Sequence, residues 1–182
     1  MKGTSMLYYN SNQLSSSYEF GKQLWELIDK QKLKDQPLVF LCIGSDRATG
    51  DSLGPIVGYK LNQRHFPSVH IYGTLESPVH AKNLDEVIRA IHDTFDQPFI
   101  VAIDASLGKA SHIGYFTLGE GSLKPGAGVG KALPQVGNLY ITGIVNLSGF
   151  LENSLLQTTR LHTVMSLADK ISTGICYCLA KL

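Results

Sequence analysis

The sequence predicts an α/β fold: a three-layer α/β/α sandwich with a mostly parallel central sheet of about five strands. Two uninterrupted apolar runs, residues 37–43 and 98–103, have the length of strands and lack the alternation of a strand with one wet face. Such runs are typical of strands buried on both faces in a parallel sheet. Segments with helical periodicity alternate with the expected strands, and this order predicts right-handed crossovers within one sheet.

The individual elements follow from apolar periodicity and from turn residues. Phe20, Leu24 and Ile28 recur on one face of a helix, and Ser16 with Glu19 has the spacing of a capping box. We expect helices over residues 16–33, 54–64, 83–92 and 152–179, and strands over residues 38–43, 69–72, 99–103, 113–118 and 139–145.

Length and composition fit one folded domain. The chain has 182 residues, of which 43% are hydrophobic and 17% charged, enough to bury a core without disulfides. No linker or repeat divides it, so we expect a single domain over residues 1–182, with residues 1–15 flexible. With 16 basic residues against 15 acidic ones, the net charge favours no nucleic-acid partner.

Cysteine usage and apolar segments bear on the compartment. The 3 cysteines, Cys42, Cys176 and Cys178, are too few for a disulfide framework and are best interpreted as small buried hydrophobic residues. The apolar runs are shorter than the roughly 20 residues of a membrane-spanning helix, and residues 1–17 lack a secretion signal. We expect a cytoplasmic protein without a membrane partner, and exposed helix faces permit a homo-oligomer.

Carboxylates follow the expected strands at the edge where α/β proteins bind ligands. Ligands of open sheets bind beyond the carboxyl ends of the strands, where the strand order reverses. Asp51 lies in the loop after the first apolar run, Glu76 follows the next strand, and Asp104 directly ends the second run. A carboxylate removed from water needs a charged or hydrogen-bonding partner, so Asp104 is the stronger candidate for a functional residue. Asp51, taken alone, favours a helix N-cap.

Two converging carboxylates can divide acid and base chemistry between them. Repulsion between like charges raises one pKa, so that the pair shares a proton. One member then activates a water while the other donates a proton. Such a pair suits hydrolysis of a peptide bond without a metal, a cofactor or a covalent intermediate.

The sequence lacks the motifs of phosphate binding, serine hydrolases and metal sites. The loop over residues 44–54 does not end in Gly-Lys-[Ser/Thr], and the glycine-rich residues 124–131 do not directly follow a strand. No Gly-x-Ser-x-Gly motif occurs, and the 6 histidines show no metal-ligand spacing. We therefore expect no metal and no cofactor. His80 and His162 are the two histidines whose positions reach toward the expected site.

Three segments carry a resemblance to a known family. Residues 41–55, 73–81 and 102–108 resemble the sporulation protein YyaC family, and the match extends from about residue 38 to the C-terminus. The sequence is also similar to the spore germination protease, an atypical aspartic endopeptidase, in the words Thr49-x-Asp51-x-Leu53-Gly54-Pro55, Ile103-Asp104-Ala105 and Pro125-Gly126-x-Gly128-Val129-Gly130. This resemblance implies that Asp51 and Asp104 are the catalytic pair and reverses the N-cap preference for Asp51.

The resemblance also implies the phosphorylase/hydrolase-like fold of the hydrogenase maturation endopeptidases. Those enzymes hold a metal with a carboxylate after the first strand, an aspartate after the third and a later histidine. Where that histidine would fall, this chain has residues 124–128, Lys-Pro-Gly-Ala-Gly, and His162 lies inside the expected final helix. This departure predicts that no metal is held.

Together these observations predict a sporulation-associated peptidase that uses Asp51 and Asp104 on a protein or peptide substrate, spore proteins among them. We expect substrate contacts from the surrounding loops, at Asp46, Thr49, Glu76, His80, Gly126 and Gly128. Two alternatives stay open. One is a non-catalytic spore protein that uses the fold as a binding module, and the other is a metal-dependent processing endopeptidase.

Overall fold

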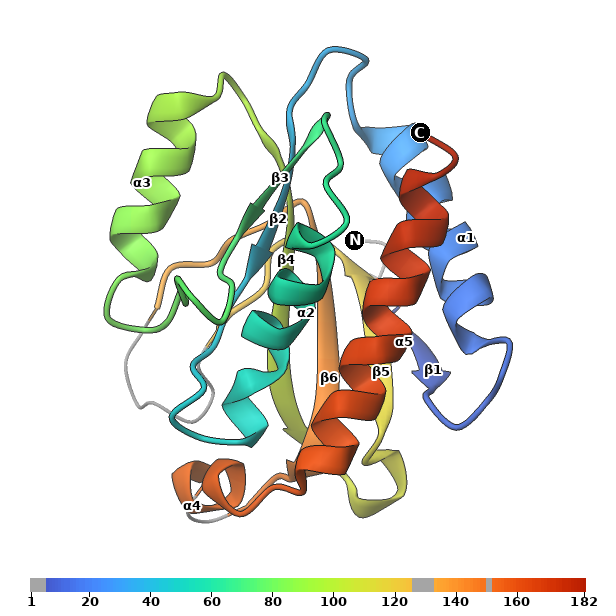
Figure 1. Ribbon diagram of the computed structural model, residues 1–182, viewed down its shortest axis with the longest axis vertical. Coiled ribbons are helices and arrows are strands. Elements are labelled where there is room, and N and C mark those ends of the chain that lie inside the picture. Colours follow the sequence, from blue (N-terminus) through green and yellow to red (C-terminus); the bar gives the residue numbers. More distant parts are fainter. Residues whose placement is uncertain (1–5, 126–132, 150–151) are drawn as a thin grey trace, which may run out of the picture.

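The structure, a computed structural model that describes residues 6–125, 133–149 and 152–182, is built on one sheet (Figure 1). The strands are β1 (Leu7–Asn10), β2 (Leu38–Cys42), β3 (Val69–Tyr72), β4 (Phe99–Gly108), β5 (Tyr115–Glu120) and β6 (Leu139–Leu147). Their order is β1-β5-β6-β4-β2-β3. β5 runs opposite to the other described strands, and the pairs β2–β3, β2–β4 and β4–β6 are parallel, so the sheet is mostly parallel, as predicted.

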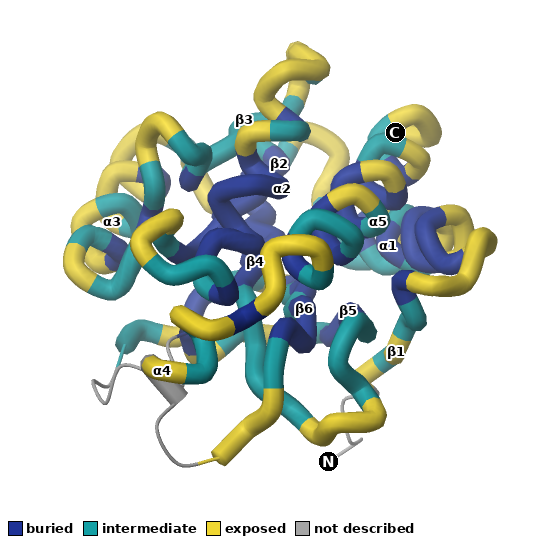
Figure 2. The backbone as a smooth tube through the Cα atoms, turned by 60° about the horizontal axis from the view of Figure 1, so that its bottom comes forward, coloured by how far each residue is buried: buried dark blue, intermediate teal, exposed yellow. Residues whose placement is uncertain are grey.

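Helices flank both faces of the sheet. They are α1 (Ser16–Gln31), α2 (Leu53–Asn62), α3 (Leu84–Thr94), α4 (Glu152–Gln157) and α5 (Leu161–Leu179), with short 3-10 helices η1 (Gly50–Ser52) and η2 (Ala110–His112). Figure 2 shows the buried strands between α3 on one side and α1 and α5 on the other. None of the helices in the described ranges is both long and apolar enough to cross a bilayer.

Two separate cores reflect the two faces. On the first face, α1, α2 and α5 bury residues such as Leu24, Val57 and Ile171 against the sheet. On the second face, α3 buries Leu84 and Ile91 against β2 and β4. The predicted α/β architecture is confirmed, but the second helical layer covers only part of the sheet, because among the described helices α3 is the one that packs there.

The sheet has a sixth strand that the sequence did not predict. β1 lies within residues 1–15, which were expected to be flexible, and it pairs antiparallel with β5. Tyr9 stacks on Phe116 at 5.3 Å between ring centroids and so ties the strand to the first core. The expectation of a flexible start is therefore wrong for Leu7–Asn10. A single half-buried aromatic in four residues gives too short a pattern to reveal a strand.

Two further expectations about helices are wrong. The capping box does not form, because Ser16 Oγ donates to the Gln13 carbonyl at 2.9 Å instead of capping α1. The expected final helix over residues 152–179 is divided into α4 and α5. Thr159 Oγ1 donates to the Leu155 carbonyl at 2.7 Å, and such side-chain bonds compete with the helical ladder.

Close packing of α2 on the end of β2 positions the loop between them. A Cβ atom at Gly54 would overlap the Ile43 carbonyl oxygen, and one at Gly58 would overlap the Gly73 carbonyl oxygen. Because these neighbours are backbone atoms, no side-chain rotation relieves the overlap. The helix therefore approaches the strand at a distance that only glycine permits.

We expect Gly54→Ala to lower the free energy of unfolding by about 1–3 kcal/mol, because the added methyl group overpacks the junction of α2 and β2. Urea unfolding followed by circular dichroism measures the change. Gly149→Ala is the control, since a Cβ there meets nothing within 4 Å, and it is expected to stay within about 0.5 kcal/mol of the parent. Equal stabilities for both variants would contradict the packing argument.

Candidate functional site

The strand order reverses at β2, which defines the ligand-binding edge of this sheet. β3 follows β2 in sequence and pairs on one side of it, whereas β4 pairs on its other side. In open α/β sheets the crevice at such a reversal, beyond the carboxyl ends of the strands, is where ligands bind. Loops that follow β2 and β3 and the end of β4 therefore form the candidate site.

Asp104 lies inside β4 rather than after it. β2 pairs with β4 only as far as Ile103, while β6 continues alongside β4 through Gly108, with Thr142 opposite Asp104. The Asp104 side chain is 6% exposed, and its Oδ1 accepts the Ala105 N–H at 2.8 Å. Because side chains alternate along a strand, Asp104 shares the second face with Ala102.

Asp51 belongs to η1, just before α2. The N-cap of α2 is Ser52, so the N-cap interpretation of Asp51 is wrong. Burial raises the pKa of the Asp51 carboxyl, and the Ser45 N–H and the nearby His80 offset part of this rise. The Ser45 N–H also donates to the Asp51 main-chain carbonyl at 3.1 Å, which closes the loop after β2.

The backbones of the two aspartates approach the same two residues at the end of β2. Ile43 N–H donates to the carbonyl of Ile103, the neighbour of Asp104, at 2.7 Å. A Cβ at Gly44, whose φ is +138°, would overlap the Asp51 carbonyl oxygen. η1 and β4 also lie in contact. Asp51 and Asp104 therefore flank the Ile43–Gly44 segment, which we call the β2 junction.

His80 is held at the same junction. Gly44 N–H donates to the Val79 carbonyl at 2.7 Å, and Val79 forms a bridge with Ile43. His80 N–H donates to Asn83 Oδ1 at 2.8 Å, at the start of α3. Its Nδ1 atom is buried and has no hydrogen-bond partner among the described residues. A buried unpaired polar atom is costly and is rare outside functional sites, which makes His80 the most informative of the expected substrate contacts.

The remaining expected contacts are dispersed. Asp46 and Thr49 line a shallow pocket of about 320 Å³ on the first face, together with apolar residues of α2 and α5 that include Ile56 and Met165. Neither Asp51 nor Asp104 lines this pocket. Glu76 is exposed in the turn after β3. The structure therefore gives Asp46 and Thr49 a site of their own, on the α2 side of the loop.

Three expectations concern residues that the structure leaves out or that lie elsewhere. Gly126 and Gly128 lie outside the described residues. His162 is exposed in the first turn of α5. Among described residues, no group of three His, Cys, Asp or Glu side chains is placed to hold a metal ion. The described donors therefore do not fit the metal of a metal-dependent processing endopeptidase, and no catalytic step is assigned to one.

Two of the three cysteines are buried as the sequence predicts, and Cys176 is half-buried. Cys42 and Cys178 are buried in the first core, and Cys176 packs against it. Burial raises the pKa of Cys178 to about 12 and that of Cys42 still further from its usual range. Since thiols with raised pKa values are poor nucleophiles, these cysteines are structural.

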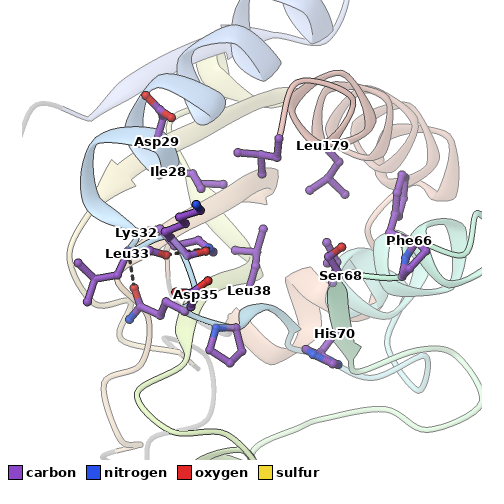
Figure 3. A pocket seen from close by; sticks show the side chains of 16 residues that line it. Ile28, Asp29, Lys32, Leu33, Asp35, Leu38, Phe66, Ser68, His70 and Leu179 are labelled. Carbon is purple, nitrogen blue, oxygen red and sulfur yellow. Dashed lines mark hydrogen bonds between the residues drawn. The ribbon is translucent and has the colours of Figure 1, made fainter.

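A larger cavity, of about 690 Å³, lies at the opposite end of the sheet. Figure 3 shows Ile28, Leu38 and Leu179 pointing into it. None of the predicted site residues lines it. The Lys32 ammonium group at its rim donates to the carbonyls of Leu33 and Lys34, so its charge is already engaged by the chain. This cavity is not part of the candidate site.

A groove that the sequence did not predict lies beside Asp104, on the second face of the sheet. Its volume is about 540 Å³, and its floor includes Thr117, Tyr140 and Thr142. A signal was present in the sequence, because the polar Tyr140 and Thr142 alternate with the apolar Ile141 in the strand expected over residues 139–145. Such alternation is typical of a strand with one face open to solvent.

These features define an α/β protein with carboxylates at the switch point of a mostly parallel sheet. The chain belongs to the family described as "Protein of unknown function (DUF1256)", whose model matches residues 6–174.

A relative from Bacillus subtilis (strain 168), "Uncharacterized protein YyaC", is 52% identical over 145 residues, which are 80% of this chain and 71% of the relative. This match confirms the resemblance to the YyaC family. Among solved structures, the chain is similar to the [NiFe] hydrogenase maturation protease HycI from Thermococcus kodakarensis KOD1. The TM-score is 0.43 and the identity 16%, over 85% of this chain and 99% of that chain.

We expect Asp51→Asn to raise the free energy of unfolding at pH 7. The pKa of Asp51 is raised in the folded state, so ionisation above the unfolded value of 3.8 penalises the folded form. The gain in the free energy of unfolding is therefore largest above the pKa that Asp51 has in the folded state. It shrinks as the pH falls and vanishes below about pH 3.8. The gain is measured by urea unfolding of the parent and of Asp51→Asn at a series of pH values between 3.5 and 7.

Asp93→Asn is the matched control, because Asp93 is exposed on α3 and lies far along the helix from the junction. It is expected to leave the stability within about 0.5 kcal/mol of the parent at every pH. A loss of stability in Asp51→Asn at pH 7 would contradict a desolvated carboxyl at this position.

Proposed function

We propose that this chain is a metal-independent peptidase of the germination-protease type, which hydrolyses peptide bonds with Asp51 and Asp104. The observation that supports the proposal is the β2 junction, where the backbone at Asp51 and the backbone next to Asp104 both lie against Ile43–Gly44. The position of the junction at the reversal of strand order supports it. The similarity of the sequence around both aspartates to the germination protease supports the same reaction class.

The surroundings of the two carboxyl groups support a different role for each in the proposed reaction. Burial raises the pKa of Asp51, which favours its protonated form and suits a general acid. Asp104 accepts a main-chain N–H, a bond that is stronger to a charged carboxylate, and this suits a general base. A water that both groups hold requires their oxygens to lie within about 6 Å of each other.

In the proposed reaction, Asp104 takes a proton from this water as the water oxygen attacks the carbonyl carbon of the peptide. The resulting tetrahedral intermediate collapses when Asp51 donates its proton to the amide nitrogen and the C–N bond breaks. The products are a carboxylic acid and an amine. Proton exchange with solvent then restores the protonated Asp51 and the charged Asp104, so the cycle needs no other reactant.

Residues around the aspartates contact the substrate in this proposal. The buried His80 Nδ1 supplies a polar atom that pairs with the substrate main chain. Asp46 and Thr49 bind a side chain in their shallow pocket, and Glu76 lies on the exposed turn beside it. Gly126 and Gly128 complete the proposed set.

The proposed setting is the cytoplasm of a sporulating cell or the spore core, with spore proteins as substrates. The three unpaired thiols support a reducing compartment. A fluorescent fusion followed through sporulation tests this setting. Export of the fusion through the cell membrane would contradict it.

We expect Asp51→Asn and Asp104→Asn each to lower kcat/KM for peptide hydrolysis by at least about 100-fold, because each removes one proton-transfer group. The assay uses a mixture of synthetic decapeptides of varied sequence, so that no single substrate has to be chosen, and mass spectrometry identifies the cleavage products. Circular dichroism checks that each variant keeps its fold.

The control is again Asp93→Asn, which is expected to cleave as the parent does. Treatment with a strong chelator is expected to leave cleavage unchanged, whereas loss of activity with recovery on adding a metal would favour the metal-dependent alternative. Equal cleavage by all variants, or no cleavage by the parent with peptides and with spore-protein extract, would overturn the peptidase and favour a binding module.

We expect His80→Ala to raise KM by about 10-fold while changing kcat less, because a substrate hydrogen bond made in both ground and transition state is lost. Steady-state kinetics on a peptide that the parent cleaves separates the two constants. His92→Ala, at an exposed position of α3, is the control. A fall in kcat with unchanged KM would instead place His80 among the groups that transfer protons.

A further inference from the structure

Among the described helices, none packs over the β1, β5 and β6 half of the second face of the sheet. α3 buries its apolar residues against β2 and β4, on the other half of this face. Over the β1, β5 and β6 half lies the groove of about 540 Å³, with Tyr8 of β1 on one wall and Ser106 of β4 at the opposite side. A sheet face that presents hydroxyl groups in a concave surface is suited to bind an extended chain.

The dimensions of the floor fit a short peptide segment. It crosses four neighbouring strands, from β1 through β5 and β6 to β4. At about 4.8 Å between strands, the three gaps span about 14 Å, which is the length of about four residues in an extended chain. Thr117 Oγ1 and Thr142 Oγ1 share a hydrogen bond of 2.7 Å, so the middle of the floor is ordered.

This groove adjoins Asp104. Thr142 of the floor is the register partner of Asp104 across β4 and β6. Ser106 follows Asp104 by two residues, so both lie on the second face. A peptide in the groove would therefore run toward the carboxylate at the β2 junction.

The charged groups of the groove have one sign. Lys109 and Lys124 line it and are exposed, and no Asp or Glu is among its lining residues within the part of the chain that the structure describes. The whole chain is nearly neutral, with 16 basic and 15 acidic residues, so this is a local excess of positive charge. By contrast, the cavity at the other end of the sheet has Asp29 and Asp35 beside its lysines.

Aromatic and hydroxyl groups supply the remaining contacts. Tyr8 is 51% exposed and lies 5.3 Å from His112 between ring centroids, with the two rings tilted by 46°, so the wall carries exposed aromatic surface. Burial, with a smaller contribution from Tyr8, raises the pKa of Tyr140, so its hydroxyl remains a hydrogen-bond donor at neutral pH. Donors and cations without a competing carboxylate favour an anionic ligand.

We propose that this groove binds an extended peptide segment of about four residues with acidic side chains, and that it selects the substrate of the proposed peptidase. The inference rests on the proposed function for its link to Asp104, but binding in the groove does not require cleavage. Two lysines at its rim meet the carboxylates of the segment, and the tyrosines contact its apolar parts.

Binding is measured by fluorescence anisotropy on the full chain with three labelled tetrapeptides, in which two alternate positions are Glu, Gln or Lys. The Glu peptide is expected to bind at least 5-fold more tightly than the Gln peptide and far more tightly than the Lys peptide. In the double variant Lys109→Gln, Lys124→Gln, affinity for the Glu peptide is expected to fall about 5- to 10-fold, since each exposed charge pair contributes modestly.

The matched control is the double variant Lys22→Gln, Lys30→Gln, which makes the same change in net charge on α1, over the first face. It is expected to bind the Glu peptide as the parent does. An equal loss of affinity in both double variants, or equal affinity for the Glu and Gln peptides, would overturn the proposal. Dimerisation through the groove would also overturn the proposal. Sedimentation would then show a dimer for the parent and a monomer for the double variant Lys109→Gln, Lys124→Gln.

The two proposals fail in distinguishable ways. If the Glu peptide binds in the groove but no peptide is cleaved, the binding proposal is supported and the peptidase proposal is contradicted. Suppose instead that peptides are cleaved and that the Lys109 and Lys124 variant keeps the KM of the parent for acidic and neutral peptides alike. The peptidase proposal is then supported and the binding proposal is contradicted.

Discussion

The end of β2 is the constraint on which the rest of the candidate site depends. Ile43 N–H binds β4 beside Asp104, Gly44 N–H binds the segment that carries His80, and Gly44 leaves room for the backbone of Asp51. Three segments far apart in the sequence thus meet at two residues. Because these contacts are made by backbone atoms, they fix the main-chain positions from which the three side chains start.

Close packing of α2 on the strands holds this junction from the first face. The absence of a Cβ at Gly54 and Gly58 lets the helix lie directly on the carbonyls of Ile43 and Gly73. Leu53, at the start of α2, is fully buried in the first core. The helix therefore anchors η1 and Asp51 through its own burial, and the carboxyl of Asp51 is desolvated as a consequence.

The two faces of the sheet have different uses. Over the first face, α1, α2 and α5 form a large core that supplies most of the apolar burial. On the second face α3 covers β2 and β4, and the half-buried Tyr140 and Thr142 of β6 line a groove beside the buried Thr117. A sheet that three helices cover on one face and a single described helix covers in part on the other combines a stable scaffold with an accessible surface next to Asp104.

The sequence by itself determined the parallel core, because residues 38–42 and 99–103 are apolar throughout and only a doubly buried strand accommodates them. It also indicated Asp51, Asp104 and His80, since polar residues that follow such strands reach the same edge. Only the tertiary structure decided that β1 joins the sheet, that β4 continues past Asp104, and that no described helix covers the β1, β5 and β6 half of the second face. These features depend on pairing between residues distant in sequence, such as Tyr9 with Phe116. The apolar periodicity of a short segment gives no information about such pairing.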